Sequence, residues 1–82
     1  MDWEEKSNFL VKTFTFRNFI KAFMLMTEVA ALAEEMAHHP WWENSYHVVT
    51  IRLNSHDARD RVTEKDIEMA GRIDEIYDRM RN

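Results

Sequence analysis

The chain has 82 residues, a formal net charge of −4 and no cysteine, and 45% of its residues are apolar. This length allows one compact domain spanning residues 1–82, and the apolar content is too high for a disordered segment. The missing cysteines exclude disulfides, thiol nucleophiles and thiolate metal sites. Mixed charges without a basic block argue against general binding to nucleic acids or anionic membranes. The acidic amino terminus lacks the apolar core of a secretory signal, so we expect a soluble, cytoplasmic protein.

The first predicted elements are two strands. In residues 10–16, apolar side chains share one face under the two-residue alternation of a strand, although Lys12 interrupts that face. Residues 3–7 are predicted to form a short partner strand, with Ser7 and Asn8 as the turn. Because the chain has one glycine and one proline, we expect mostly regular elements and few tight turns.

A long helix is predicted next. Asn18 is a good N-cap, and Pro40 ends the helix because the residue before a proline is disfavoured in the helical region. Between them, Lys21, Glu28 and Glu35 recur every seven residues, while apolar side chains cover the remaining circumference. One sheet face does not cover an apolar arc that wide. We therefore expect this helix to be sandwiched, either by a second helix or by another subunit.

A strand, a polar loop and a final helix are predicted in the second half of the chain. Residues 46–53 alternate as a strand, residues 54–61 are polar, and Thr63–Asp66 resembles a capping box with Asp in place of Glu. Apolar side chains then recur at spacings of three and four between Ile67 and Met80. This order predicts an α+β fold, a two-layer sandwich in which an antiparallel sheet carries the helices on one face. Three strands and two helices make a small core, which again favours self-association.

Histidines are the first candidates for chemistry, because the unperturbed pKa of this side chain lies near neutral pH. His38 and His39 end the long helix and His56 follows the predicted strand. Such ends are where a rigid scaffold presents functional side chains, and the two ends converge if the helix packs on the sheet. A polar helix end without further role is the alternative interpretation of the adjacent pair. His47 alternates onto the apolar strand face and is interpreted as a packing residue.

Metal binding is a weaker hypothesis. A zinc site built from His38, His39 and His56 would need two adjacent rings to turn towards one ion, and the His-x-x-x-His helical spacing is absent. Trp41 and Trp42 are interpreted either as a small core beneath the loop or as a flat apolar wall for a planar heterocycle.

Several short motifs extend over nearly the whole chain. They are Phe14-x-Phe16-x-x-Phe19, Ala22-Phe23 with Met26, Val29-Ala30, Ala33-Glu34, His38-His39-Pro40-x-Trp42, Tyr46, Val49-x-Ile51-x-Leu53, Ser55-His56 and Thr63-x-x-Asp66. With these motifs the chain resembles the pterin-4a-carbinolamine dehydratases. The His-His-Pro-x-Trp run, with its upstream Glu and later Ser-His, is the most specific part of the resemblance.

The resemblance implies a hydro-lyase that dehydrates 4a-hydroxytetrahydropterin to quinonoid dihydropterin during tetrahydrobiopterin recycling, without a metal or organic cofactor. The leaving hydroxyl needs a proton and a ring nitrogen loses one, and imidazoles suit both tasks. By position, the catalytic residues implied are His38 as base, with His39 and His56 as acids. The substrate-binding residues implied are Glu34, Pro40, Trp42, Ser55, Asp57 and Ala58.

The resemblance also implies an assembly. The family fold, a sheet with helices on one side, associates into dimers and tetramers, so we expect a homo-oligomer. Relatives usually begin with a helix before the first strand; this chain begins near the tryptophan that follows it, so we expect that helix to be missing. Relatives also commonly have a glycine turn and one residue fewer after the position of His56, and an acidic or polar residue at the position of Trp41.

Two functions from other classes remain open. The first is a non-catalytic dimerisation or assembly module on the same fold, which the missing helix and the wide apolar arc would suit. The second, weaker one is a regulator or chaperone of a partner enzyme such as an aromatic amino-acid hydroxylase. No feature of the sequence indicates a nucleic acid or a membrane as partner.

Overall fold

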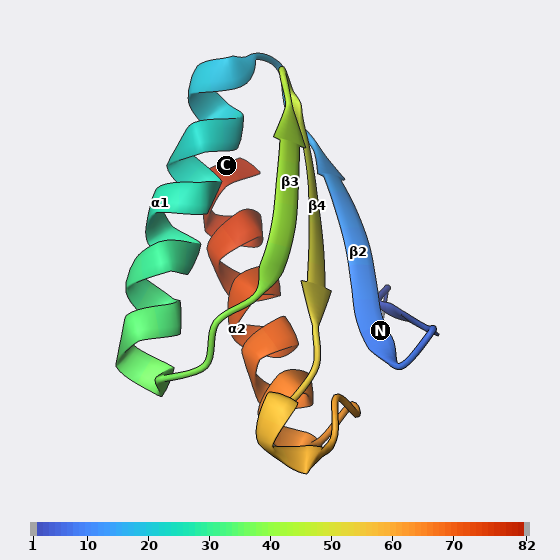
Figure 1. Ribbon diagram of the computed structural model, residues 1–82. Helices are drawn as coiled ribbons and strands as arrows, with labels where there is room; N and C mark the ends of the chain where they lie inside the picture. The colour runs from blue at the N-terminus through green and yellow to red at the C-terminus, as the bar shows by residue number, and fades with distance from the viewer. Residues whose placement is uncertain (1, 82) are drawn as a thin grey trace.

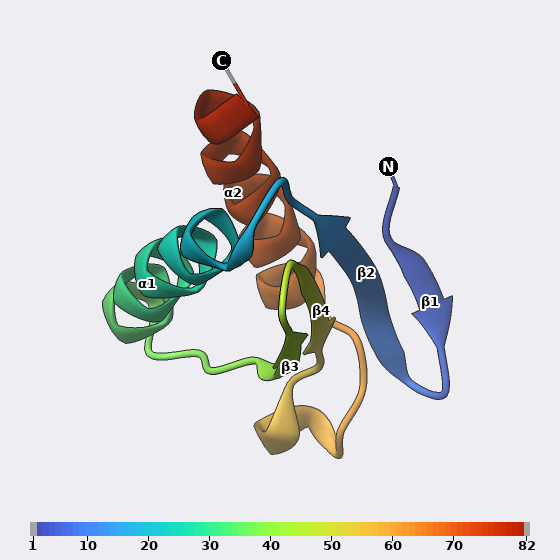
Figure 2. The same ribbon diagram turned by 90° about the horizontal axis from the view of Figure 1, so that it is seen from above.

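The computed structural model describes residues 2–81 as one sheet with two helices on the same side (Figures 1 and 2). The elements are β1 (Glu4–Lys6), β2 (Phe9–Thr15), α1 (Phe19–Met36), β3 (Trp41–Ser45), β4 (Val48–Leu53), the 3-10 helix η1 (His56–Ala58) and α2 (Glu64–Arg81). All neighbouring strands pair antiparallel, in the order β1-β2-β4-β3. The predicted α+β two-layer sandwich is confirmed. Within residues 2–81, no helix is long and apolar enough to cross a membrane.

The amino-terminal hairpin forms as predicted. Ser7 and Asn8 make the turn in the left-handed region, with φ of 52° and 68°. Lys12 lies on the core side of β2, where its Nζ contacts Asp74 Oδ1 at 2.8 Å. The indole Nε1 of Trp3 donates to both oxygens of the same carboxylate at 3.1 Å. The polar interruption of the apolar face is therefore neutralised by a carboxylate from α2.

Helix α1 begins at the predicted cap, but it ends at Met36, before the predicted stop at Pro40, so His38 and His39 lie beyond the helix. The side chain of Asn18 accepts a hydrogen bond from the backbone N–H of Lys21 at 2.9 Å, and Ala37 adopts a left-handed conformation that closes the last turn. One face of the helix is buried against β4 and α2. The opposite side carries four exposed apolar residues, Phe19, Ile20, Phe23 and Met24, which we call the α1 apolar face. The second helix therefore covers only part of the wide apolar arc.

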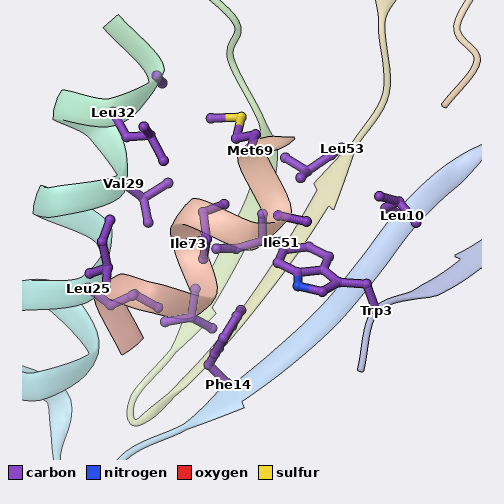
Figure 3. Packing of buried hydrophobic residues seen from close by; sticks show 14 of the residues in the cluster. Trp3, Leu10, Phe14, Leu25, Val29, Leu32, Ile51, Leu53, Met69 and Ile73 are labelled. Carbon is purple, nitrogen blue, oxygen red and sulfur yellow. The ribbon is translucent and has the colours of Figure 1, made fainter. Parts of the chain in front are cut away.

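The core lies between the sheet and the two helices (Figure 3). Phe14 and Ile51 contribute from the sheet, Leu25 from α1, and Met69 and Ile73 from α2; none of the five is more than 1% exposed. Trp3 meets the ring of Phe14 edge to face, with the centroids 5.8 Å apart. Residues far apart in the sequence thus fix the helices against one face of the sheet.

Strand β3 corrects the prediction, which placed three strands in the chain and began one of them at Tyr46. Tyr46 and His47 are instead the turn of a β3–β4 hairpin, and Tyr46 has a φ of 50°. The sequence of β3 lacks the apolar alternation that indicates a strand, because its inward positions include the polar Asn44. The amide of Asn44 donates to the carbonyls of Tyr46 and Val48 at 3.1 and 3.0 Å, so it builds the turn instead of filling the core.

Turns in this chain form without glycine. Within residues 2–81, six non-glycine residues have positive φ: Ser7, Asn8, Ala37, Tyr46, Arg59 and Asp60. Gly71 lies inside α2. The scarcity of glycine predicted few tight turns. The chain nevertheless forms tight turns, because other residues adopt the left-handed region at a cost in conformational free energy.

Candidate active site

Three of the four histidines lie at the end of the molecule where α1 and β4 both end, the lower end in Figure 1. His38 and His39 follow α1, and His56 begins η1. All three line a cleft of about 290 Å³, together with Asp57 and Lys65. The structure therefore brings together the histidines that the sequence places at separate element ends.

His38 belongs to a buried polar network centred on Asp66. Asp66 is fully buried, and its Oδ1 lies 2.5 Å from Nε2 of His38. Its Oδ2 accepts hydrogen bonds from the Ser55 hydroxyl at 2.9 Å and from the Thr63 backbone N–H at 2.8 Å. The Ser55 hydroxyl also lies 2.6 Å from the Thr63 hydroxyl. A carboxylate with this many donors fixes the end of α1, the end of β4 and the start of α2 relative to each other.

The predicted capping box therefore has a second role. Asp66 caps the backbone N–H of Thr63, as the sequence predicted for the start of α2. The same side chain reaches His38, which lies 28 residues earlier. The serine donates to the aspartate and not to a histidine, so this trio is not the arrangement that activates a serine nucleophile.

His39 and His56 are exposed, and each is paired with a carboxylate. Nε2 of His39 lies 2.7 Å from Glu34 Oε2, and Nδ1 of His56 lies 2.9 Å from Asp60 Oδ1. The hydrogen bond at one ring nitrogen determines which nitrogen carries the proton, and so leaves the other nitrogen for a ligand. Both imidazoles face solvent and are therefore accessible to a small molecule.

A larger cleft opens beside the histidines. It has a volume of about 620 Å³, within the range of small-molecule sites. Its lining comes from the β1–β2 turn, the start of β3 and the loop after β4: Ser7, Asn8, Phe9, His39, Pro40, Trp41, Asn54, His56 and Asp60. His39 and His56 line both clefts.

Five of the six residues implied as substrate-binding lie in different surroundings, and the sixth, Trp42, is described below. Pro40 lines the larger cleft and Asp57 lines the smaller one. Glu34 holds His39, Ser55 is buried beside Asp66, and Ala58 ends η1.

The two tryptophans, interpreted from the sequence either as core or as a pocket wall, lie in different surroundings. Trp42 packs against the hydrophobic core, and Trp41 lines the larger cleft. Neighbouring residues of a strand point to opposite faces, so only one of the two tryptophans can face the cleft. Because the sequence did not predict β3, it did not show which of the two tryptophans faces the cleft.

The sequence predicted Asp66 as part of a helix cap but not as a residue of this site. Its sequence signal, Thr63-x-x-Asp66, indicates the cap but not the histidine partner, because that contact depends on how α1 and α2 pack.

Among residues 2–81, no group of three or more histidine, aspartate or glutamate side chains is placed to hold one metal ion.

Comparisons with known proteins agree on the family. The family model for pterin 4 alpha carbinolamine dehydratase matches residues 1–76. A provisionally named pterin-4-alpha-carbinolamine dehydratase of Prochlorococcus marinus is 46% identical over 76 residues, covering 93% of this chain and 78% of that protein. One of Opitutus terrae with the same provisional name is 43% identical over 74 residues, covering 90% and 76%.

Solved structures share the fold. A crystal structure of a transcriptional coactivator/pterin dehydratase from Brucella melitensis superposes with a TM-score of 0.86 at 35% identity, covering 92% of this chain and 81% of that one. A pterin dehydratase-like protein identified as a RuBisCO assembly factor in the alpha-carboxysome superposes with a TM-score of 0.77 at 26% identity, covering 90% and 87%. On this match of sequence and fold, the chain belongs to the pterin 4 alpha carbinolamine dehydratase family.

Proposed function

We propose that this chain is a hydro-lyase that converts 4a-hydroxytetrahydropterin to quinonoid dihydropterin and water, in tetrahydrobiopterin recycling. Family membership supports the substrate class. The observation that carries the proposal is the placement of His39 and His56, which come from different segments, line the same clefts and are each paired with a carboxylate.

The reaction needs one proton accepted and one delivered. A base takes the proton from the ring nitrogen, the C4a–O bond breaks as the C4a–N double bond forms, and the hydroxyl leaves as water after an acid protonates it. Base and acid must therefore reach two neighbouring positions of one substrate. With side chains 63% and 97% exposed, His39 and His56 are accessible for these two tasks.

His38 is placed differently, since its side chain is 8% exposed and its Nε2 is bonded to Asp66. We propose that His39 and His56 form the pair that touches substrate. His38 as the base stays a prediction that would use its remaining nitrogen, Nδ1. In our proposal Glu34 and Asp60 orient the imidazoles of His39 and His56, because each carboxylate is hydrogen-bonded to one ring nitrogen.

The test is the decay of chemically generated 4a-hydroxytetrahydropterin, followed by absorbance with and without purified protein. We expect the wild type to accelerate the decay and His39→Ala or His56→Ala to lower the rate by at least about 100-fold, the lower range for general acid–base catalysis. His38→Ala, run in parallel, tests the role of Nδ1. His47→Ala is the matched control, because His47 lies in the β3–β4 turn at the opposite end of the sheet. A wild-type protein without acceleration contradicts the proposal.

A second candidate function is a non-catalytic assembly module on the same fold. The α1 apolar face favours it, as does the structural neighbour that serves as a RuBisCO assembly factor. On either proposal we expect a cytoplasmic homodimer or homotetramer that buries this face. A protein that forms stable oligomers but does not accelerate pterin dehydration would support the assembly module over the enzyme.

A further inference from the structure

Trp41 is an unusually exposed aromatic residue for so small a protein. It begins β3 with 67% of its surface exposed, whereas tryptophans are on average highly buried. The next residue, Trp42, points to the other face of the sheet and packs against the core. Core packing therefore accounts for one tryptophan of the pair and not for the other.

Contacts within the chain do not explain the exposed indole. Trp41 is paired in register with Arg52, whose guanidinium could stack on it. That guanidinium instead donates to Glu43 Oε1 at 2.8 Å. Across residues 2–81, no ring–ring or cation–ring contact involves Trp41.

The surroundings of Trp41 are those of a ligand site. The residue lines the cleft of about 620 Å³ that also contains His39 and His56. Phe9 and Pro40 line the same cleft. Their rings and the indole of Trp41 therefore lie beside the two imidazoles. A concave site with apolar rings and a few polar groups is how proteins bind planar small molecules.

We propose that Trp41 is a substrate-binding residue whose indole stacks on the planar, nitrogen-rich ring of the ligand while His39 and His56 act at its edge. The inference rests on the proposed function for the identity of that ligand. Stacking on the guanidine-like N1–C2–N3 portion of the pyrimidine ring holds the ligand before and after dehydration alike, because this portion stays planar while C4a, in the same ring, changes from tetrahedral to trigonal. Such uniform binding lowers KM and leaves kcat nearly unchanged.

The kinetic test uses three substitutions at one position. We expect Trp41→Ala to raise KM about tenfold, in the lower part of the range for loss of one ring–base stack, with kcat changed less than about twofold. Trp41→Phe should keep KM within about threefold, because it retains an aromatic face, whereas Trp41→Leu should behave like the alanine variant. Tyr46→Ala is the matched control: Tyr46 is 64% exposed and lies at the opposite end of the β3–β4 hairpin.

A binding measurement separates this inference from the proposed function. Isothermal titration with 7,8-dihydrobiopterin, which does not react, should give about tenfold weaker binding for Trp41→Ala than for wild type. If the wild type dehydrates the substrate but Trp41→Ala keeps its KM and its affinity, the inference is wrong and the enzyme proposal stands. If the wild type lacks activity but binds the dihydropterin through Trp41, the enzyme proposal fails and the binding site stands.

Sedimentation of Trp41→Ala completes the test. An unchanged oligomeric state together with the weaker binding supports a ligand-binding role. A changed oligomeric state with unchanged KM and affinity would assign the indole to a contact between subunits and overturn the inference.

Discussion

Replacing Asp66 should destabilise the fold more than any exposed acidic substitution. Asp66 is fully buried, and His38, Ser55 and Thr63 all direct polar groups at its carboxylate. Asp66→Ala would leave these groups buried without an acceptor, and each buried polar group left unsatisfied costs about 1–3 kcal/mol. A domain of this length has a total stability of about 4–12 kcal/mol. We therefore expect the alanine variant to be partly or wholly unfolded at room temperature.

Asp66→Asn is a smaller perturbation than Asp66→Ala, because the asparagine side chain has nearly the same volume as that of aspartate. Oδ2 accepts from both Ser55 and Thr63, so the amide oxygen must take that position and the amide nitrogen then faces His38. His38 must change from donor to acceptor at Nε2. The variant exchanges a charge-assisted hydrogen bond for a neutral one, at a cost of about 2 kcal/mol. That loss corresponds to a drop in Tm of about 10 °C for a domain of this size.

Thermal and urea unfolding followed by far-ultraviolet circular dichroism measures both effects at one protein concentration. Asp60→Asn is the matched control, since Asp60 makes the same kind of contact to a histidine in an exposed pair. The free energy of unfolding of the control should stay within about 0.5 kcal/mol of wild type. An Asp66→Ala variant that unfolds within the same margin would refute the argument that this carboxylate joins the three segments.

Three further substitutions test other parts of the fold. Asp74→Ala should lower the free energy of unfolding by about 2 kcal/mol and red-shift tryptophan emission, because Lys12 and Trp3 both lose their acceptor; unchanged emission would contradict the docking of the hairpin on α2. Asn18→Ala should cost about 1 kcal/mol through loss of the helix cap, measured by urea unfolding. Phe23→Glu, at a residue 54% exposed, should leave the thermal stability of the monomer unchanged and weaken self-association in sedimentation; a variant that associates like wild type would exclude the α1 apolar face as the interface.

Local features of the sequence predicted most elements correctly. The Asn18 cap and the cap at Thr63 each act within one helical turn, so their residues are visible side by side in the chain. The strand alternation in β2 is equally local, and Leu10 and Phe14 are buried on the predicted face despite the interruption at Lys12.

Strand β3 shows where local patterns fail. An edge strand is defined by the neighbour with which it pairs, and β3 pairs with β4 on one side only. Its inward side offers Trp42 and then the polar Asn44, which turns its amide to the hairpin backbone. No alternation of apolar residues remains to indicate a strand, and a tyrosine in the left-handed region at position 46 does not look like a turn.

The sequence by itself determined the residue types of the site, three histidines near the ends of elements. Only the tertiary structure decided their environments. His38 is buried because α1 ends against the start of α2, where Asp66 meets it, whereas His39, one residue later, faces the cleft. The pairing of β3 likewise turned Trp42 to the core and Trp41 to the cleft. Burial depends on contacts between residues distant in the chain, and a local pattern does not contain those contacts.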